Sequence, residues 1–353
     1  MSYQLYKWTF RPKSGVITPF LSDILWGHLV WAISYEQGNI KELLSQFNTN
    51  TPPWVISDAF IKDCLPIPRY GKPFEFPTNI PKQEGILIWR IIEHLDKVKY
   101  VHVNIFNEMC SGLTPYKLYQ EILEGIRNPI TFFKLAKPLS YDTNIKRYEK
   151  ILSHCAKTIY DNKTEVDTKK RSILSAFFVE QEVNKNSINR LTNSAEQLYT
   201  QVETYYTDDL DVYLKINSEF DITILEKAIK YIEASGYGKK ASAGKGQIQT
   251  ISFEKSESIS MDYKENGFIS LSTYIPNEKD YTEIIYANSN TKYGKISSNL
   301  GENNVFKHPF TYDEAGSIFR GSPDVYKGKM LYNVHKNPDI VQYGLSFSVG
   351  VNI

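Results

Sequence analysis

One stretch points most directly to chemistry, because it carries three lysines and a serine among glycines and alanines. Residues 236–246 read Gly-Tyr-Gly-Lys-Lys-Ala-Ser-Ala-Gly-Lys-Gly. Glycine adopts positive φ values at little cost and lets the backbone approach a ligand closely. Turned backbone N–H groups and ammonium groups both favour negative charge. The stretch therefore predicts a polyanion site, most plausibly for phosphates, built from Gly236, Gly238, Lys239, Lys240, Ser242, Gly244, Lys245 and Gly246.

The order of the flanking elements disfavours the two common nucleotide-binding loops, because both of those loops run from a strand into a helix. Here residues 222–234 have helical apolar spacing, and residues 247–253 alternate like a strand. The glycines thus join a helix to a following strand. A Walker A loop would also carry Ser or Thr where Gly246 follows Lys245. A glycine helix cap and a solvated loop remain the alternative interpretation.

The composition is that of an ordinary globular protein, without a field that attracts polyanions. The chain has 353 residues, of which 41% are hydrophobic and 23% charged, and its net charge is +1. This length allows two domains with substantial cores. Because the whole molecule is nearly neutral, any nucleic-acid surface must be local.

The three cysteines, Cys64, Cys110 and Cys155, are far apart and include no C-x-x-C pair. Neither a disulfide framework nor a metal site is indicated, so we expect no metal, no cofactor and a cytoplasmic location. The first ten residues read as a strand rather than a signal peptide. The longest apolar stretch, 24–33, is too short to span a bilayer, so no membrane contact is expected.

Strand and helix patterns occur at both ends of the chain. Residues 3–10 alternate as a first strand, and a helix capped by Ser22 is expected to end near Gly38. Residues 107–200 are expected to be mostly helical or irregular. Further strands are expected at 54–61, 99–106, 212–216, 247–253, 268–274 and 342–351. Strand–helix–strand at both ends predicts an α+β fold of two split βαβ, ferredoxin-like domains.

The predicted boundary between the two domains falls near residue 205. Residues 1–205 would form the N-terminal domain, with large helical and irregular insertions. Residues 206–353 would form the C-terminal ferredoxin-like domain, which carries the glycine-rich loop.

Five stretches, taken in order, resemble one known family. They are 22–29, 56–60, 188–192, 236–246, and three C-terminal elements counted together, 271–276, 315–319 and 343–345. The set is similar to the RAMP superfamily, and specifically to the guide-RNA 5′-tag-binding subunit of Csm-type (type III-A) CRISPR effector complexes. Three positions depart from the family pattern: Ile24 replaces Thr, Ile61 replaces Pro and Asn189 replaces Asp.

The resemblance implies two RRM-like ferredoxin domains, no nuclease activity and RNA held through its sugar-phosphate backbone. The implied partners are the 5′ tag of crRNA, the large polymerase-like subunit and the backbone RAMP subunit. A β-hairpin thumb that intercalates at the first guide segment is also implied, at a position that the sequence does not give. The RNA-binding set then comprises the loop residues together with Arg190, Arg171, Ser22 and His28.

Two other functions stay open. Cleaving members of the superfamily use a histidine at or near the first helix as general acid or base, so a metal-independent endoribonuclease with His28 in that role is the alternative. The position of His28 on the apolar face with Ile24 and Ala32 favours a packed histidine instead. A third interpretation is a two-domain protein whose loop binds a small phosphorylated metabolite.

Overall fold

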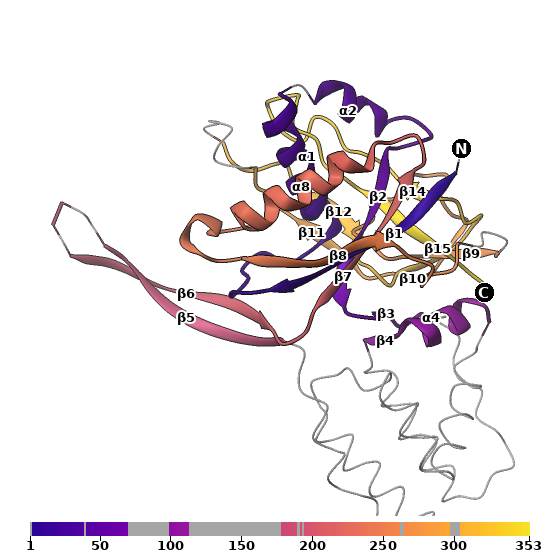
Figure 1. Ribbon diagram of the computed structural model, residues 1–353, viewed down its shortest axis with the longest axis horizontal. Helices are drawn as coiled ribbons and strands as arrows, with labels where there is room; N and C mark the ends of the chain where they lie inside the picture. Colours follow the sequence, from indigo (N-terminus) through magenta and orange to yellow (C-terminus); the bar gives the residue numbers. More distant parts are fainter. Residues whose placement is uncertain are drawn as a thin grey trace, which may run out of the picture.

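A four-stranded antiparallel sheet organises the chain in the computed structural model (Figure 1), which describes residues 2–38, 40–69, 99–112, 178–188, 191–192, 194–261, 265–296 and 304–353. The strand order is β2-β7-β1-β8, with β1 pairing with β7 on one side and β8 on the other. These strands are β1 (Tyr3–Pro12), β2 (Trp54–Ile61), β7 (Leu210–Asn217) and β8 (Ile248–Lys255).

Two helices accompany this sheet and give it ferredoxin-like connectivity. Helix α1 (Ser22–Gln37) follows β1, and α8 (Ile222–Ser235) follows β7, so the order is β-α-β-β-α-β. The two helices pack side by side (Figure 1). The side chain of Asp221 caps α8 by accepting a hydrogen bond from the N–H of Thr223 at 3.0 Å. The predicted strands and the end of α1 at Gly38 are thus confirmed for this unit.

A second sheet follows in the C-terminal part, with the order β10-β13-β9-β15-β14. Its strands are β9 (Gly267–Ser270), β10 (Glu283–Tyr286), β13 (Ile318–Arg320), β14 (Tyr326–Gly328) and β15 (Leu345–Val351). No α-helix lies among the described residues after β8, so a second ferredoxin-like unit is not confirmed. The mixed α/β character is confirmed.

Smaller elements complete the fold. They are the helices α2 (Lys41–Gln46), α4 (Val103–Cys110) and the 3₁₀ turn η2 (Ala241–Ala243), and the strand pairs β3 (Cys64–Pro66) with β4 (Tyr100–His102) and β11 (Ser289–Lys292) with β12 (Phe310–Asp313). The strand predicted at 99–106 stops at His102, because its side chain caps α4 by accepting from the N–H of Asn104. None of the described helices is long and apolar enough to cross a bilayer.

One hydrophobic core connects the two sheets, with Trp8 on the first and Ile269 on the second among its buried members. Lys215 of β7 is fully buried and donates to the carbonyls of Val325 and of Ser348 on β15. The four-stranded sheet takes β1 and β2 from before residue 205, and β7 and β8 from after it. The predicted boundary between residues 205 and 206 therefore does not separate two sheets.

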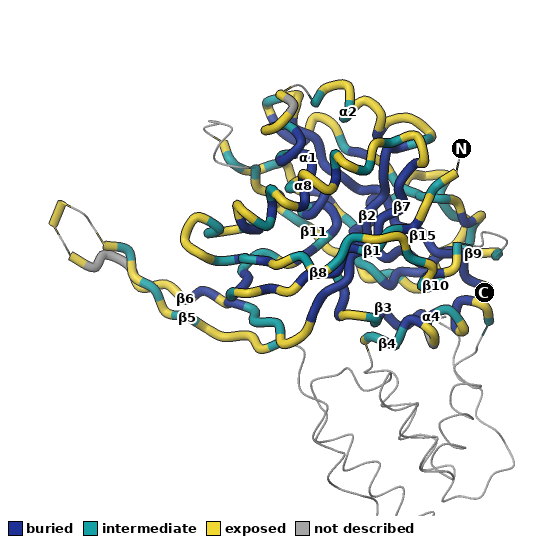
Figure 2. The backbone as a smooth tube through the Cα atoms, viewed as in Figure 1, coloured by how far each residue is buried: buried dark blue, intermediate teal, exposed yellow. Residues whose placement is uncertain are grey.

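A long hairpin projects from the body and is exposed along much of its length (Figures 1 and 2). It consists of β5 (Phe178–Ile188) and β6 (Ala195–Tyr206), paired antiparallel from Phe178↔Tyr206 outwards. The expectation of helix or irregular structure is wrong for its residues up to 200. Polar side chains on both faces of β5 hide the alternation that marks a half-buried strand.

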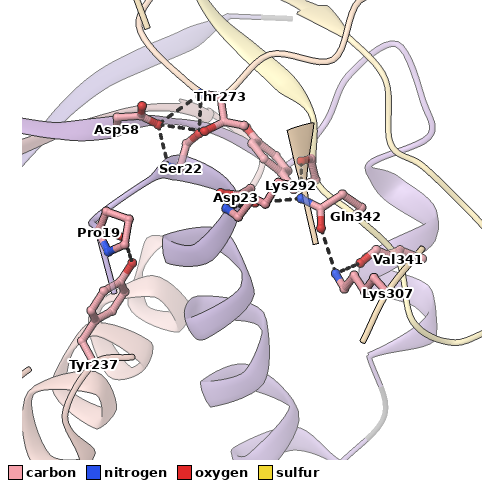
Figure 3. A network of polar contacts seen from close by, with 11 residues as sticks. Pro19, Ser22, Asp23, Asp58, Tyr237, Thr273, Lys292, Lys307, Val341 and Gln342 are labelled. Atoms are coloured by element: carbon pink, nitrogen blue, oxygen red, sulfur yellow. Dashed lines mark hydrogen bonds and ion pairs between the residues drawn. The ribbon is translucent and has the colours of Figure 1, made fainter. Parts of the chain in front are cut away.

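A buried polar network joins the start of α1 to β2 and to the segment that follows β9 (Figure 3). Asp58 Oδ1 accepts from the N–H groups of Ser22 at 2.7 Å and Thr273 at 3.1 Å. Burial raises the pKa of the Asp58 carboxyl to about 6. Beside it, Asp23 pairs with Lys292 at 2.7 Å. Ser22 is not the helix cap, because Leu21 occupies that position and the Ser22 hydroxyl accepts from the Thr273 N–H.

We expect Asp58→Ala to lower the free energy of unfolding by about 2–4 kcal/mol, because two buried N–H donors lose their acceptor. Asp58→Asn keeps an oxygen at that position and should lose less than half as much. Urea denaturation of both variants measures the difference. Equal losses would show that Oδ1 is not what holds the network together.

Candidate nucleic-acid interface

The glycine-rich loop leaves α8 and enters β8 through a chain of left-handed turns. Its four glycines, at 236, 238, 244 and 246, all have positive φ, and Lys240 shares that conformation at 62°. At Gly246, a Cβ would lie 1.9 Å from the Tyr237 carbonyl oxygen. Only glycine fits there, so the loop closes on itself: the Tyr237 N–H donates to the Gly246 carbonyl at 2.8 Å.

The loop is held against the segment that precedes α1. The Tyr237 ring is buried and stacks on Phe20 with 4.5 Å between the ring centroids. The Tyr237 hydroxyl donates to the carbonyl of Pro19 at 2.8 Å (Figure 3). The backbone N–H of Lys239 donates to Thr18 Oγ1 at 2.9 Å. These contacts fix the loop backbone before any ligand arrives.

His28 belongs to the same anchor. Its Nε2 accepts from the N–H of Gly238 at 3.1 Å, and its ring centroid lies 4.6 Å from that of Tyr237. Burial lowers the pKa of His28 to about 4, so the ring is neutral at pH 7. The lone pair that a general base needs is already engaged. His28 therefore holds the loop backbone in place, and this role disfavours both proton transfer and direct RNA contact.

Lys240 and Lys245 of the loop point towards strand β6 of the hairpin. Lys240 Nζ donates to the hydroxyl of Tyr199 on β6 at 3.1 Å and lies 5.3 Å from the centroid of its ring. Lys245 Nζ lies 2.5 Å from Oε2 of Glu203, also on β6. Lys239 is exposed. Loop and hairpin therefore form one continuous surface.

Two residues of this surface were not predicted from the sequence, Lys185 and Glu203. Lys185 stands opposite Tyr199 in the register of the hairpin, and its Nζ lies 2.8 Å from Glu203 Oε1. The hydrogen bond from Lys240, and the charges of the lysines around it, lower the pKa of Tyr199. Four ammonium groups and one carboxylate thus gather at the junction. We call the set Lys185, Lys239, Lys240, Lys245 and Glu203 the junction cluster.

The remaining predicted residues are dispersed. Ser242 is exposed within η2. Ser22 is fully buried in the network of Figure 3 and offers no surface to RNA, since its hydroxyl accepts from the N–H of Thr273 in the segment after β9. Arg171 and Arg190 lie outside the described residues.

No protein-family model matches the chain, and no curated protein matches it. Solved structures do. A chain of the Csm3–Csm4 subcomplex of a type III-A CRISPR-Cas interference complex matches with a TM-score of 0.60 and 16% identity, over 99% of this chain and 100% of that one. A chain of a Csm1–Csm4 cassette in complex with cA4 matches with a TM-score of 0.53 and 14% identity, over 99% and 98%. The chain thus has the fold of these chains from Csm complexes, and at the level of fold the resemblance is confirmed.

Gly246→Ala should destabilise the protein clearly more than Gly244→Ala. Both glycines have positive φ, which costs about 1–2 kcal/mol for alanine. A Cβ at Gly244 meets nothing within 4 Å, whereas one at Gly246 collides with backbone. Urea unfolding of the two variants makes the comparison; similar losses would mean that the loop does not close through Tyr237.

The unfolding free energy should depend on pH through His28. Its folded pKa is depressed, so the unfolded state binds more protons between about pH 4 and 6.5. Stability is therefore lost as the pH falls through this window. We expect the difference between wild type and His28→Gln, which keeps an acceptor but does not titrate, to shrink by about 2–3 kcal/mol from pH 7.5 to 4. A difference that is constant with pH would contradict the buried, neutral histidine.

Proposed function

We propose that this protein, which has the fold of Csm-complex chains, is a non-catalytic RNA-binding subunit of a type III-A CRISPR interference complex. It holds the 5′ tag of crRNA through the sugar-phosphate backbone. The observation that carries the proposal is the junction cluster, which concentrates four lysines at one place on a chain whose net charge is only +1.

The chemistry of the junction cluster suits single-stranded RNA. Lysine ammonium groups contact phosphates as point charges, and an exposed aromatic ring beside them offers a stacking surface for a base. Tyr199 is 42% exposed and lies between Lys185 and Lys240. Because Tyr237 and His28 fix the loop in advance, little conformational entropy is lost when the strand binds.

The hairpin is our candidate for the thumb that the family resemblance implies. Its stem carries Tyr199 and Lys185 beside the glycine-rich loop, and its outer half is exposed (Figure 2). An RNA strand that follows the lysines from the glycine-rich loop would reach this stem. We infer that the hairpin separates the tag from the first guide segment.

The proposed partners follow from the solved complexes. Csm4 is named in both the Csm3–Csm4 subcomplex and the Csm1–Csm4 cassette. We infer that this chain occupies the corresponding position, between a large polymerase-like subunit and a backbone RAMP subunit. The endoribonuclease alternative has no support from the geometry, since Nε2 of His28 is occupied by the Gly238 N–H.

We expect Lys239→Ala/Lys240→Ala to weaken binding of crRNA and to flatten its salt dependence. Each phosphate contact on single-stranded nucleic acid contributes a slope of about 0.7 in log K against log[salt], so losing two contacts reduces the slope by up to about 1.4. Fluorescence anisotropy with labelled crRNA, at several salt concentrations, measures both quantities.

The matched control is Lys255→Ala/Lys279→Ala, which removes the same charge from two exposed positions. Lys255 ends β8, at the opposite end of that strand from the loop. The control should bind like wild type. An unchanged slope in the loop variant, or an equal loss in the control, would reject the proposed role of the loop. A parallel arm with a scrambled tag separates recognition of the tag from binding of any RNA.

A further inference from the structure

The buried carboxylate of Glu203 stands at the centre of the junction cluster and is surrounded by donors. Its side chain is 1% exposed. Oε1 accepts from Lys185 Nζ at 2.8 Å and from Gln201 Nε2 at 3.1 Å. Oε2 accepts from Lys245 Nζ at 2.5 Å and from the Tyr205 hydroxyl at 3.0 Å. Four donors from three segments of the chain therefore converge on one carboxylate.

The backbone packs closely over this group. A Cβ at Gly15 would lie 2.9 Å from Glu203 Oε2, so the segment after β1 touches the carboxylate directly. The Gly15 carbonyl accepts from the N–H of Gly246 at 3.1 Å, and Val16 pairs with Thr204 through two backbone hydrogen bonds. The glycine-rich loop, the segment after β1 and the base of the hairpin thus meet at Glu203.

We propose that Glu203 is a positioning residue that withholds Lys245 and Lys185 from phosphates and directs the RNA backbone to Lys239 and Lys240. This proposal rests on the proposed function and specifies which lysines of the junction cluster contact the RNA backbone. The carboxylate cancels one of the two charges beside it, and it repels a phosphate that approaches either amine. Lys245, predicted from the sequence to contact phosphate, instead fastens the loop to the hairpin.

The electrostatics support separate roles for the two pairs of lysines. Hydrogen bonds from Lys185 and Lys245 lower the pKa of Glu203 to about 2, so it remains ionised throughout the neutral range. Each of these two lysine side chains is only 24% exposed. Lys240 Nζ instead donates to the hydroxyl of Tyr199, and Lys239 is exposed.

A purely structural ion pair would make a different prediction from a charge-limiting one. Removing a structural pair changes the stability of the protein but leaves the number of phosphates that it neutralises unchanged. Removing a charge-limiting carboxylate frees the two ammonium groups that it holds, those of Lys185 and Lys245. The slope of log K against log[salt] counts phosphate contacts and is the readout that separates the two.

The test compares Glu203→Gln, Glu203→Asp and wild type for binding of labelled crRNA across a range of salt concentrations. We expect E203Q to steepen the slope by up to about 1.4, because each of the two freed ammonium groups can gain a phosphate at about 0.7 per contact. E203D retains the charge and should keep the wild-type slope. The double variant E203Q/K245Q frees Lys185 alone and should steepen the slope by about half as much as E203Q. Thermal unfolding checks that each variant is folded.

Each outcome has one meaning. A wild-type slope in folded E203Q overturns the role of Glu203, while a weakened K239A/K240A variant leaves the proposed function standing. A steeper slope in E203Q with an unaffected K239A/K240A variant supports Glu203 and rejects the loop contacts. Wild-type protein that binds no crRNA rejects both. If E203Q does not fold, a wild-type slope in E203Q/K245Q overturns the inference, and a steeper slope supports it.

Discussion

The pairing of β1 with β8 is the constraint on which the rest of the site depends. The register brings Arg11 opposite Gln249 and Pro12 opposite Ile248, so the chain leaving β1 runs beside the chain entering β8. The ladder continues beyond the strands, because the N–H of Lys13 donates to the Gln247 carbonyl at 2.7 Å. The glycine-rich loop therefore lies on the segment before α1 as a consequence of strand register. Its position does not require a ligand.

Local patterns were sufficient to predict the elements of the four-stranded sheet but not their partners. The alternation of β1, the apolar spacing of α8 and the glycine that ends α1 each depend on a few neighbouring residues. The pairing of β1 with β7 and β8 joins residues about two hundred positions apart, and no local pattern encodes it. The sequence therefore suggested a boundary near residue 205, whereas the four-stranded sheet takes strands from both sides of that position.

The same limit explains which site residues were missed. Glycines and lysines of the loop are conspicuous in the sequence because they are adjacent. Lys185 and Glu203 lie in a hairpin with polar residues on both faces, and their importance arises only when three segments meet. For Ser22 the prediction from residue type was wrong. Serine is typical of a helix cap, but the hydroxyl of Ser22 accepts a hydrogen bond from the N–H of Thr273 instead. Tertiary competition for polar groups is not visible in a local pattern.

The strand order also governs how this protein can be made. Neither β1 nor β2 pairs with the other, and among the described strands of their sheet both depend on β7, which begins at Leu210. On the ribosome, the amino-terminal third of the nascent chain thus emerges with two apolar strands and no partner for either. At about 5–20 residues per second, that exposure lasts on the order of ten seconds or more. The nascent chain is therefore prone to aggregate during synthesis, and a chaperone that covers these two strands would lower that risk.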